Sequence, residues 1–341
     1  MSNKNQESMH AQIIWKRPRK WIAPLAIFGV IIFYGYSIKT SHSAGVIPVF
    51  NQTLGYEPAA VSSGELSLLT YNVAGLPEII SAAESPRAAS MKVISERINS
   101  FDIVNVQEDF YYHRELYNGG NMHRYRTRQK QAIPFGDGLN ILSKYPVLES
   151  QRVEWTDCHG ADCYAAKGFL FTRIEIARGM TVDVYNLHAT ASDIEPAVKA
   201  REKNLLQLKQ FIEQHSGNRA LLVMGDFNAH YAAGWDDLAR FYQPLELQDA
   251  WVLLQNNGTV PNVINEFVAT DKLRLTDSCE SIDKIYFRNS SSIEFTPRSY
   301  KVENRQFQNG QGQALSDHCA VSLNLAWRKR QLSENLNTDL P

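Results

Sequence analysis

Short apolar stretches alternate with two amphipathic ones from Glu65 onward. Eight of the short stretches predict β-strands, because most of them are rich in β-branched and aromatic residues and are bounded by Gly, Pro, Asn or Asp. They cover residues 66–73, 102–108, 138–143, 169–176, 181–189, 220–227, 281–287 and 319–327. Two longer stretches, residues 85–101 and 192–215, repeat apolar residues at spacings of three and four and predict helices. Several strands with few helices between them favour two packed sheets with helices outside over a single parallel sheet.

The N-terminal part has a different pattern. Four basic residues precede an uncharged run: Lys16, Arg17, Arg19 and Lys20. The run covers residues 21–38, the short end of a membrane span, for which about 20 apolar residues are typical. We expect a basic cytoplasmic tail over residues 1–20, a transmembrane signal-anchor over 21–38, a linker over 39–63, and the remainder on the extracytoplasmic side. A cleaved signal peptide, which would make the protein secreted, and a buried soluble helix are the alternatives.

The formal net charge of −1 hides an asymmetry along the chain. Residues 1–63 hold six basic and two acidic residues, which leaves 29 basic and 34 acidic residues in the remainder, a net charge of −5. A nonspecific DNA-binding protein needs a basic face, because phosphate contacts supply most of its affinity. The charge therefore disfavours nucleic acid as a partner, although a local basic patch would still permit it.

Polar side chains recur at the ends of the predicted strands, where functional sites are usually built. In chain order they are Asn72, Glu108, His188, Asp226, Asn228, Asp283, Asp317 and His318. Any one of them alone fits a solvated strand end, a turn or a structural histidine. Their recurrence in this order predicts one common site.

These residues lie in the stretches LLTYNVAGLP, VNVQED, GDGLNILSKYP, VYNLHA, LLVMGDFNA, SIDKIYF and LSDHCAV. In this order the stretches resemble the endonuclease/exonuclease/phosphatase superfamily, with the DNase I-like fold, over roughly residues 64–327. The resemblance implies an α/β fold, a four-layer α/β/β/α sandwich with two packed mixed β-sheets. It also implies hydrolysis of a phosphoester with a divalent metal, usually Mg²⁺. Residues 328–341 are expected to be a polar tail.

The chemistry of the residues agrees with this resemblance. Phosphate esters are anionic, and a hard cation with oxygen ligands neutralises them. Glu108 is the predicted primary ligand, and Asn72 can add a carbonyl oxygen. No Cys or His cluster has zinc spacing, which favours Mg²⁺ or a similar hard ion. Asp226 and Asn228 share a face if extended, and can orient the attacking water and a phosphate oxygen or bind a second metal. His188 can donate to a phosphate oxygen.

Asp317 and His318 are neighbours in the chain, which invites the idea of a catalytic pair. Successive side chains of a strand point to opposite faces, so a strand that begins at Asp317 would separate the two. His318 is the predicted general base on water. Asp283 can supply the second carboxylate, and in the resembled family the acid of that strand motif holds the catalytic histidine. The resemblance places Asp317 near the metal or in its outer shell.

The segment WTDCHGADCYAAKGFLFTRIEI bears on the substrate. Its AKGF sequence resembles the sphingomyelinase, phospholipase C-type branch, in which a Lys-Gly pair follows a loop near the site. Lys167 can meet the substrate phosphate as a point charge, or it is an exposed turn lysine. A membrane anchor fits a phospholipid substrate, but Phe295, Tyr300 and Phe307 are scattered where bacterial sphingomyelinases often carry an aromatic hairpin. A nonspecific endonuclease or phosphatase of the superfamily, and a non-catalytic binding module, are the alternatives.

Four cysteines are too few for a disulfide-stapled scaffold. Cys158 and Cys163 flank a four-residue loop, and Cys279 and Cys319 lie near the strands of Asp283 and His318. Both pairings are conceivable in an extracytoplasmic domain, and buried free thiols are the alternative. The sequence carries no indication of an oligomeric state.

Overall fold

The computed structural model describes residues 57–132 and 135–331. Its strands are β1 (Ser63–Asn72), β2 (Ile103–Gln107), β3 (Tyr125–Arg126), β4 (Asn140–Ser143), β5 (Val147–Glu154), β6 (Gly168–Ala177), β7 (Met180–His188), β8 (Leu221–Asp226), β9 (Gln248–Asp249), β10 (Asp283–Arg288), β11 (Ile293–Val302) and β12 (Val321–Lys329). Its α-helices are α2 (Arg87–Arg97), α3 (His113–Asn118), α4 (Glu195–His215), α5 (Ala239–Tyr242) and α6 (Ala250–Gln255).

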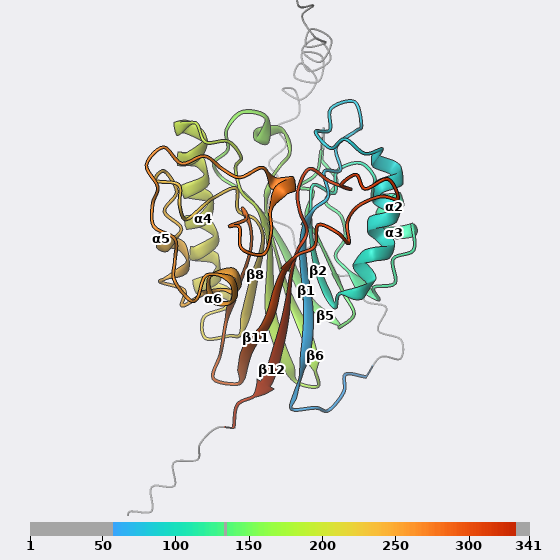
Figure 1. The fold of residues 1–341 in the computed structure, drawn as a ribbon. Helices are drawn as coiled ribbons and strands as arrows, with labels where there is room; N and C mark the ends of the chain where they lie inside the picture. Colours follow the sequence, from blue (N-terminus) through green and yellow to red (C-terminus); the bar gives the residue numbers. More distant parts are fainter. Residues whose placement is uncertain (1–56, 133–134, 332–341) are drawn as a thin grey trace, which may run out of the picture. The chain divides into compact units, whose positions relative to one another are not determined.

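The strands form two six-stranded sheets that pack face to face (Figure 1). The first has the order β11-β12-β1-β2-β4-β3, and the second has the order β5-β6-β7-β8-β10-β9. Both are mixed, because β1 and β2 run parallel in the first, β7 and β8 run parallel in the second, and the other neighbours are antiparallel. Two packed mixed sheets with few helices agree with the predicted fold class.

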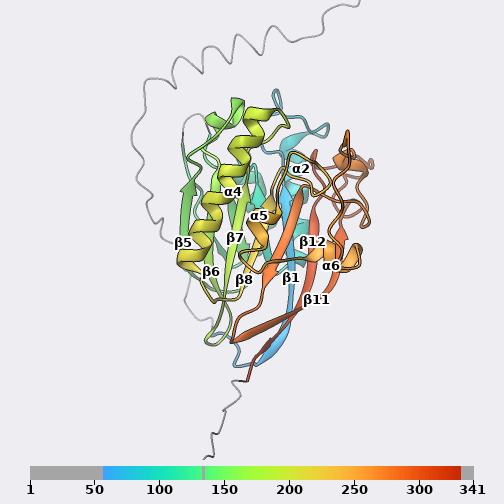
Figure 2. The ribbon, with the colours of Figure 1, turned by 90° about the vertical axis from the view of Figure 1, so that its left-hand side faces the viewer.

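Each sheet is covered by helices on its outer face. Leu68 of β1 belongs to the core between the sheets, whereas its neighbour Leu69 packs with Met91 and Ile94 of α2. This burial of both faces explains why β1 is apolar almost throughout. On the other side, Phe211 of α4 packs against aromatic rings of β6 and β7. Figure 2 shows α4 lying across these strands.

Buried amide side chains join the two sheets below the strand ends. Asn105 Nδ2 donates to the carbonyl oxygens of Tyr185 and Met224 in the opposite sheet, at 2.9 and 3.1 Å. Gln107 Nε2 donates to Asn186 Oδ1 at 2.7 Å, also across the interface. Buried polar groups are costly unless they are hydrogen-bonded. These bonds therefore fix the spacing of the sheets just beneath the predicted site.

All eight predicted strands and both predicted helices are present, and their ends differ from the prediction by up to three residues. The first helix is the exception at its C-terminus, where its last part is a 3₁₀ turn, Ile98–Ser100. The strands β3, β5, β9 and β11 and the short helices α3, α5 and α6 were not predicted. The paired strands begin at Ser63 and end at Lys329, slightly outside the expected domain of residues 64–327. The predicted tail and anchor, residues 1–20 and 21–38, lie outside the described residues. In the described part of the chain, no helix has the length and apolar character needed to cross a bilayer.

Candidate active site

Strand register brings three of the predicted residues into one row. His188 ends β7 and lies opposite Asp226, the last residue of β8. Asp283 begins β10 and lies opposite Asp226 on its other side. In the other sheet, Asn72 ends β1, and Glu108 directly follows β2. The predicted residues therefore gather where strands of both sheets end.

Two glycines allow close backbone approach at this edge. Gly225 directly precedes Asp226, and a Cβ atom on it would lie 2.2 Å from the carbonyl oxygen of Leu187 in β7, so only glycine fits at this position. A Cβ atom on Gly168 would lie 1.9 Å from the carbonyl oxygen of Val153. The glycines of the GDFN and AKGF motifs are thus explained by packing of neighbouring strands.

Asn72 links carboxylates from both sheets. Its Nδ2 donates to Glu108 Oε1 at 3.0 Å and to Asp226 Oδ2 at 3.1 Å, and its Oδ1 accepts from the backbone N–H of Ala74. The carbonyl oxygen predicted as a metal ligand is therefore turned away from Glu108. Asn228, the other amide of the predicted set, donates from Nδ2 to the carbonyl oxygen of Ala189 at 3.2 Å. Glu108 and Asn228 both have positive φ, 58° and 50°, a strained backbone that is typical of functional sites.

The electrostatics of the two linked carboxylates differ. Burial raises the pKa of Glu108 above its ordinary value, although Lys167 and the bond from Asn72 oppose the rise. Burial also acts to raise the pKa of Asp226, but His318 and His188 outweigh it and lower the pKa to about 2. Asp226 is therefore an anion at neutral pH, whereas the charge of the half-buried Glu108 is not fully compensated.

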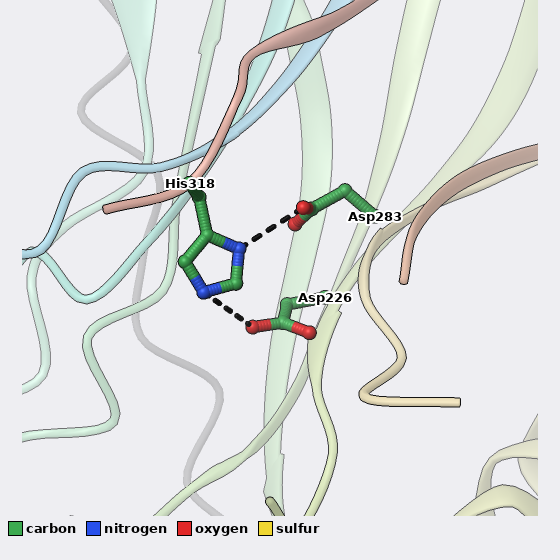
Figure 3. Close-up of side chains that lie close together, drawn as sticks. All are labelled: Asp226, Asp283 and His318. Atoms are coloured by element: carbon green, nitrogen blue, oxygen red, sulfur yellow. Dashed lines mark hydrogen bonds and ion pairs between the residues drawn. The ribbon is translucent and has the colours of Figure 1, made fainter. Parts of the chain in front are cut away.

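His318 is held by a carboxylate from another strand (Figure 3). Its Nδ1 lies 3.0 Å from Asp283 Oδ2, and its Nε2 lies 3.7 Å from Asp226 Oδ2. Burial acts to lower the pKa of His318, but Asp283 and Asp226 outweigh it and raise the pKa to about 9. Asp283 in turn has a pKa raised by burial, which the histidine opposes.

The chain around Asp317 is not a strand, since β12 begins only at Val321. The alternation of side chains invoked for Asp317 and His318 therefore does not reach them. A turn separates the two instead: Ser316 Oγ donates to the carbonyl oxygen of Asn72 at 2.7 Å and accepts from the backbone N–H of His318 at 3.3 Å. Asp317 itself is half-buried, and its Oδ1 lies 3.4 Å from Ser316 Oγ.

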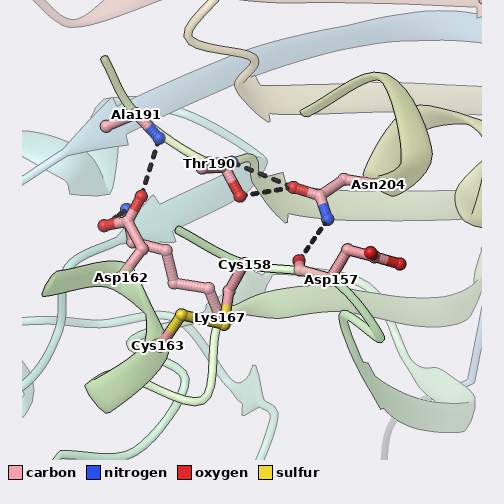
Figure 4. The surroundings of a disulfide bond; sticks show 8 residues. All are labelled: Asp157, Cys158, Asp162, Cys163, Lys167, Thr190, Ala191 and Asn204. Atoms are coloured by element: carbon pink, nitrogen blue, oxygen red, sulfur yellow. Dashed lines mark hydrogen bonds and ion pairs between the residues drawn. A yellow bond between two sulfur atoms is a disulfide. The ribbon is translucent and has the colours of Figure 1, made fainter. Parts of the chain in front are cut away.

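Lys167 is buried, so the alternative of an exposed turn lysine is wrong. Its Nζ lies 2.6 Å from Asp162 Oδ1 and 2.9 Å from His188 Nε2. Asp162 stands in the loop closed by the disulfide of Cys158 and Cys163, and its other oxygen accepts from the N–H of Ala191 at 2.7 Å (Figure 4). Of the two conceivable disulfides only this one forms, and Cys279 and Cys319 are free thiols.

His188 lies between Lys167 and Asp226. Burial and Lys167 lower its pKa to about 3, so its ring is neutral at physiological pH. Nε2 faces the ammonium at 2.9 Å and must accept the bond, because a lysine has only donors. The proton of the ring is then on Nδ1, which is buried without a hydrogen-bond partner among the described residues. The ring nitrogen that faces Asp226 is Nε2, which lies 3.4 Å from Asp226 Oδ2.

Three residues of the site were missed from the sequence. Asp162 could have been found, since it lies five residues before Lys167 in a loop between two cysteines. Ser316 precedes the Asp-His pair, but nothing marked its contact with Asn72. Lys272 lies in a long loop without a motif, yet its Nζ is 2.7 Å from His318 Nε2.

The donor set fits a hard divalent cation. Within the described residues, ligating atoms of Asp226, Asp283 and His318 lie within 4.8 Å of one another. Asp283 Oδ1 is buried without a hydrogen-bond partner among the described residues, and the half-buried Glu108 shares the donor Asn72 Nδ2 with Asp226. The carboxylates of Asp226, Asp283 and Glu108 supply oxygen donors, which suit Mg²⁺ or a similar ion rather than zinc, and His318 adds one nitrogen donor.

Comparison with known proteins agrees with the predicted resemblance. The Endonuclease/Exonuclease/phosphatase family matches residues 69–318 of the chain. Sphingomyelinases of Mycobacterium bovis and Mycobacterium tuberculosis are 37% identical to it over 271 residues, which are 78% of this chain and 53% of each relative. The chain therefore spans about half the length of these curated relatives.

Solved structures share the fold. A mutant beta toxin from Staphylococcus aureus with bound magnesium ions superposes with a TM-score of 0.57 at 16% identity, covering 76% of this chain and 99% of that one. Sphingomyelinase C from Streptomyces griseocarneus gives a TM-score of 0.54 at 18% identity, with the same coverage of both chains. At such identities the likeness shows the fold alone.

Proposed function

Since this chain belongs to the Endonuclease/Exonuclease/phosphatase family, we propose that it is a metal-dependent phosphodiesterase acting on a phospholipid of the sphingomyelin type. One observation carries the chemistry: His318 is bonded to Asp283 and faces a buried Lys167–His188 pair across Asp226. This places a base and a positive charge around one space. The sphingomyelinase relatives support the choice of lipid, and so does the net negative charge of the domain, which disfavours DNA.

The residues have separable tasks in this reaction. His318 takes a proton from water on Nε2, in the neutral form of its ring, while Asp283 holds the opposite ring nitrogen. Since the pKa of His318 is about 9 without a metal, a cation bound nearby would be needed to favour this neutral form at physiological pH. The water oxygen forms a bond to phosphorus, and the bond to the lipid alcohol breaks, with its electron pair leaving on that alcohol oxygen. Lys167 can stabilise charge on the phosphate oxygens, and His188 can donate to one of them from Nε2 once Lys167 Nζ has turned from that nitrogen to the phosphate.

A divalent cation, Mg²⁺ in this proposal, would supply Lewis-acid stabilisation of the phosphate charge. Glu108 would hold it, with Asn72 joining after rotation of its amide and Asp317 acting nearby. Asp226 and Asn228 would orient the water and a phosphate oxygen. The raised pKa of Glu108 supports this role, because a cation would stabilise the charge that burial disfavours.

A direct assay separates this proposal from the other activities of the superfamily. The purified protein should release phosphocholine from sphingomyelin vesicles in Mg²⁺, and EDTA should stop the release. Supercoiled plasmid DNA in the same buffer should stay intact. Nicked plasmid beside intact lipid would overturn the lipid proposal and identify a nuclease instead.

We further propose that residues 21–38 anchor the protein with the catalytic domain outside the cytoplasm. The disulfide of Cys158 and Cys163 supports this location, because disulfides persist in oxidising compartments. Protease added to intact cells that express the full chain should then remove the catalytic domain. Protection of the domain until the cells are lysed would argue against this orientation, and domain in the medium would indicate cleavage of the anchor.

A further inference from the structure

A second lysine stands at the site, on the side opposite Lys167. Lys272 Nζ lies 2.7 Å from His318 Nε2, as Lys167 Nζ lies 2.9 Å from His188 Nε2. Asp226 Oδ2 lies between the imidazoles, 3.4 Å from His188 Nε2 and 3.7 Å from His318 Nε2. Each imidazole of the site is thus flanked by Asp226 and by one lysine.

The backbone of Lys272 is tied to the segment that carries the base. Lys272 opens a 3₁₀ turn, Lys272–Arg274, whose N-terminus is capped by Asp271, with Oδ1 accepting from the N–H of Leu273 at 3.0 Å. The buried thiol of Cys319 donates to the carbonyl oxygen of Lys272 at 2.7 Å. Cys319 directly follows His318, so the bond connects the turn with the catalytic histidine. Arg274 in the same turn is exposed instead.

The contact between Lys272 and His318 is incompatible with catalysis by the same nitrogen. Whichever of the two nitrogens carries the proton between them, Nζ at 2.7 Å fills the position beside Nε2 that an attacking water needs. Asp283 accepts from Nδ1, which leaves Nε2 as the nitrogen able to take a proton from water. Water and Lys272 therefore compete for one position, and the lysine must leave before the base can act. Its positive charge then needs a new anionic partner.

We propose that Lys272 is a ligand of the substrate phosphate that covers Nε2 of His318 until the phosphate arrives. The anionic phosphodiester attracts the ammonium to a nonbridging oxygen, and this movement opens Nε2 to water. The base is thereby exposed only when the substrate is bound. The inference rests on the proposed phosphoester chemistry of the site but not on the identity of the lipid.

Phosphate binding tests the inference without relying on lipid turnover. We would compare Lys272→Met and Lys272→Arg with Arg274→Met, which removes the same charge from an exposed position of the same turn. The probes are inorganic phosphate, by calorimetry at fixed Mg²⁺, and bis(4-nitrophenyl) phosphate as a soluble diester. Lys272→Met should weaken phosphate binding about tenfold or more, as expected for loss of a charge-assisted hydrogen bond. Lys272→Arg should recover part of this loss, and Arg274→Met should stay within about twofold of the wild type.

A second measurement uses the unaltered protein, in case Lys272→Met fails to fold. The ¹⁵N signal of His318 Nε2 should shift when phosphate is added, because Lys272 Nζ leaves its position beside this nitrogen. An unchanged signal at saturating phosphate would overturn the inference. Equal phosphate affinity in folded Lys272→Met and Arg274→Met would also overturn it. Cleavage of the soluble diester without cleavage of sphingomyelin would refute the lipid proposal alone.

Discussion

Replacement of Asp283 by Asn should show which carboxylate serves His318. The Asp283 carboxylate lies 3.0 Å from Nδ1 of His318. Asp283 and, to a smaller extent, Asp226 raise the pKa of His318 from 6.5 to about 9 against the effect of burial. A rise of this size corresponds to about 3 kcal/mol of stabilisation of the imidazolium. Asp283→Asn would remove the charge, and the new amide, with its NH₂ turned to Nδ1, would place the ring proton on Nε2. We therefore expect kcat to fall about a thousandfold or more.

The matched variant Asp317→Asn removes a carboxylate next to His318 in the chain. Its Oδ1 lies 3.4 Å from Ser316 Oγ, so we expect a smaller loss, about ten- to a hundredfold, as for a group that orients ligands. Both variants would be assayed with Mg²⁺ on sphingomyelin and on the soluble diester, and ¹⁵N spectra would report the tautomer of His318. A larger loss in Asp317→Asn than in Asp283→Asn, or an unchanged tautomer in Asp283→Asn, would refute the reasoning.

Three further predictions concern other parts of the domain. Glu108→Gln should abolish Mg²⁺-dependent turnover, and retained turnover would refute its role as ligand. The metal-free thermal stability should not fall, because the variant removes a carboxylate whose charge is disfavoured by partial burial. Burial lowers the pKa of His123 to about 4, so up to about 3 kcal/mol of the free energy of unfolding should be lost as the pH falls from 6.5 to 4. His123→Gln should lose less in the same denaturation series. Removal of the disulfide by Cys158→Ala with Cys163→Ala should lower the free energy of unfolding by less than about 3 kcal/mol, since the loop is short. It should also lower kcat/KM, because the loop that faces Lys167 becomes looser. Unchanged kcat/KM would contradict this expectation.

The strands that the sequence pattern missed share one property. The four of them, β3, β5, β9 and β11, are the edges of the two sheets. Edge strands face solvent and carry polar residues, and β11 contains Pro297 at a register shift, so their patterns are weak. The eight predicted strands are interior and have neighbours on both sides. Apolar periodicity therefore reports burial within a sheet rather than the presence of a strand.

The site divides in a similar way. Residues at ends of interior strands, such as His188, Asp226 and Asp283, could be predicted because register carries them to one edge. Lys272 could not, because a long loop has no periodicity that relates it to His318. The orientation of the Asn72 amide could not either, since it depends on two carboxylates from different sheets.

Nearness in the chain and nearness in the site are set by different physics here. Asp317 is one residue from His318, but the turn at Ser316 directs the two side chains to different neighbours. Asp283 is 35 residues away, and the pairing of β10 with β8 brings it to the ring. The period of a strand is two, so a slip of one residue in that pairing would turn Asp283 to the other face. The catalytic pair is therefore a property of sheet register, which the buried amides between the sheets help to hold.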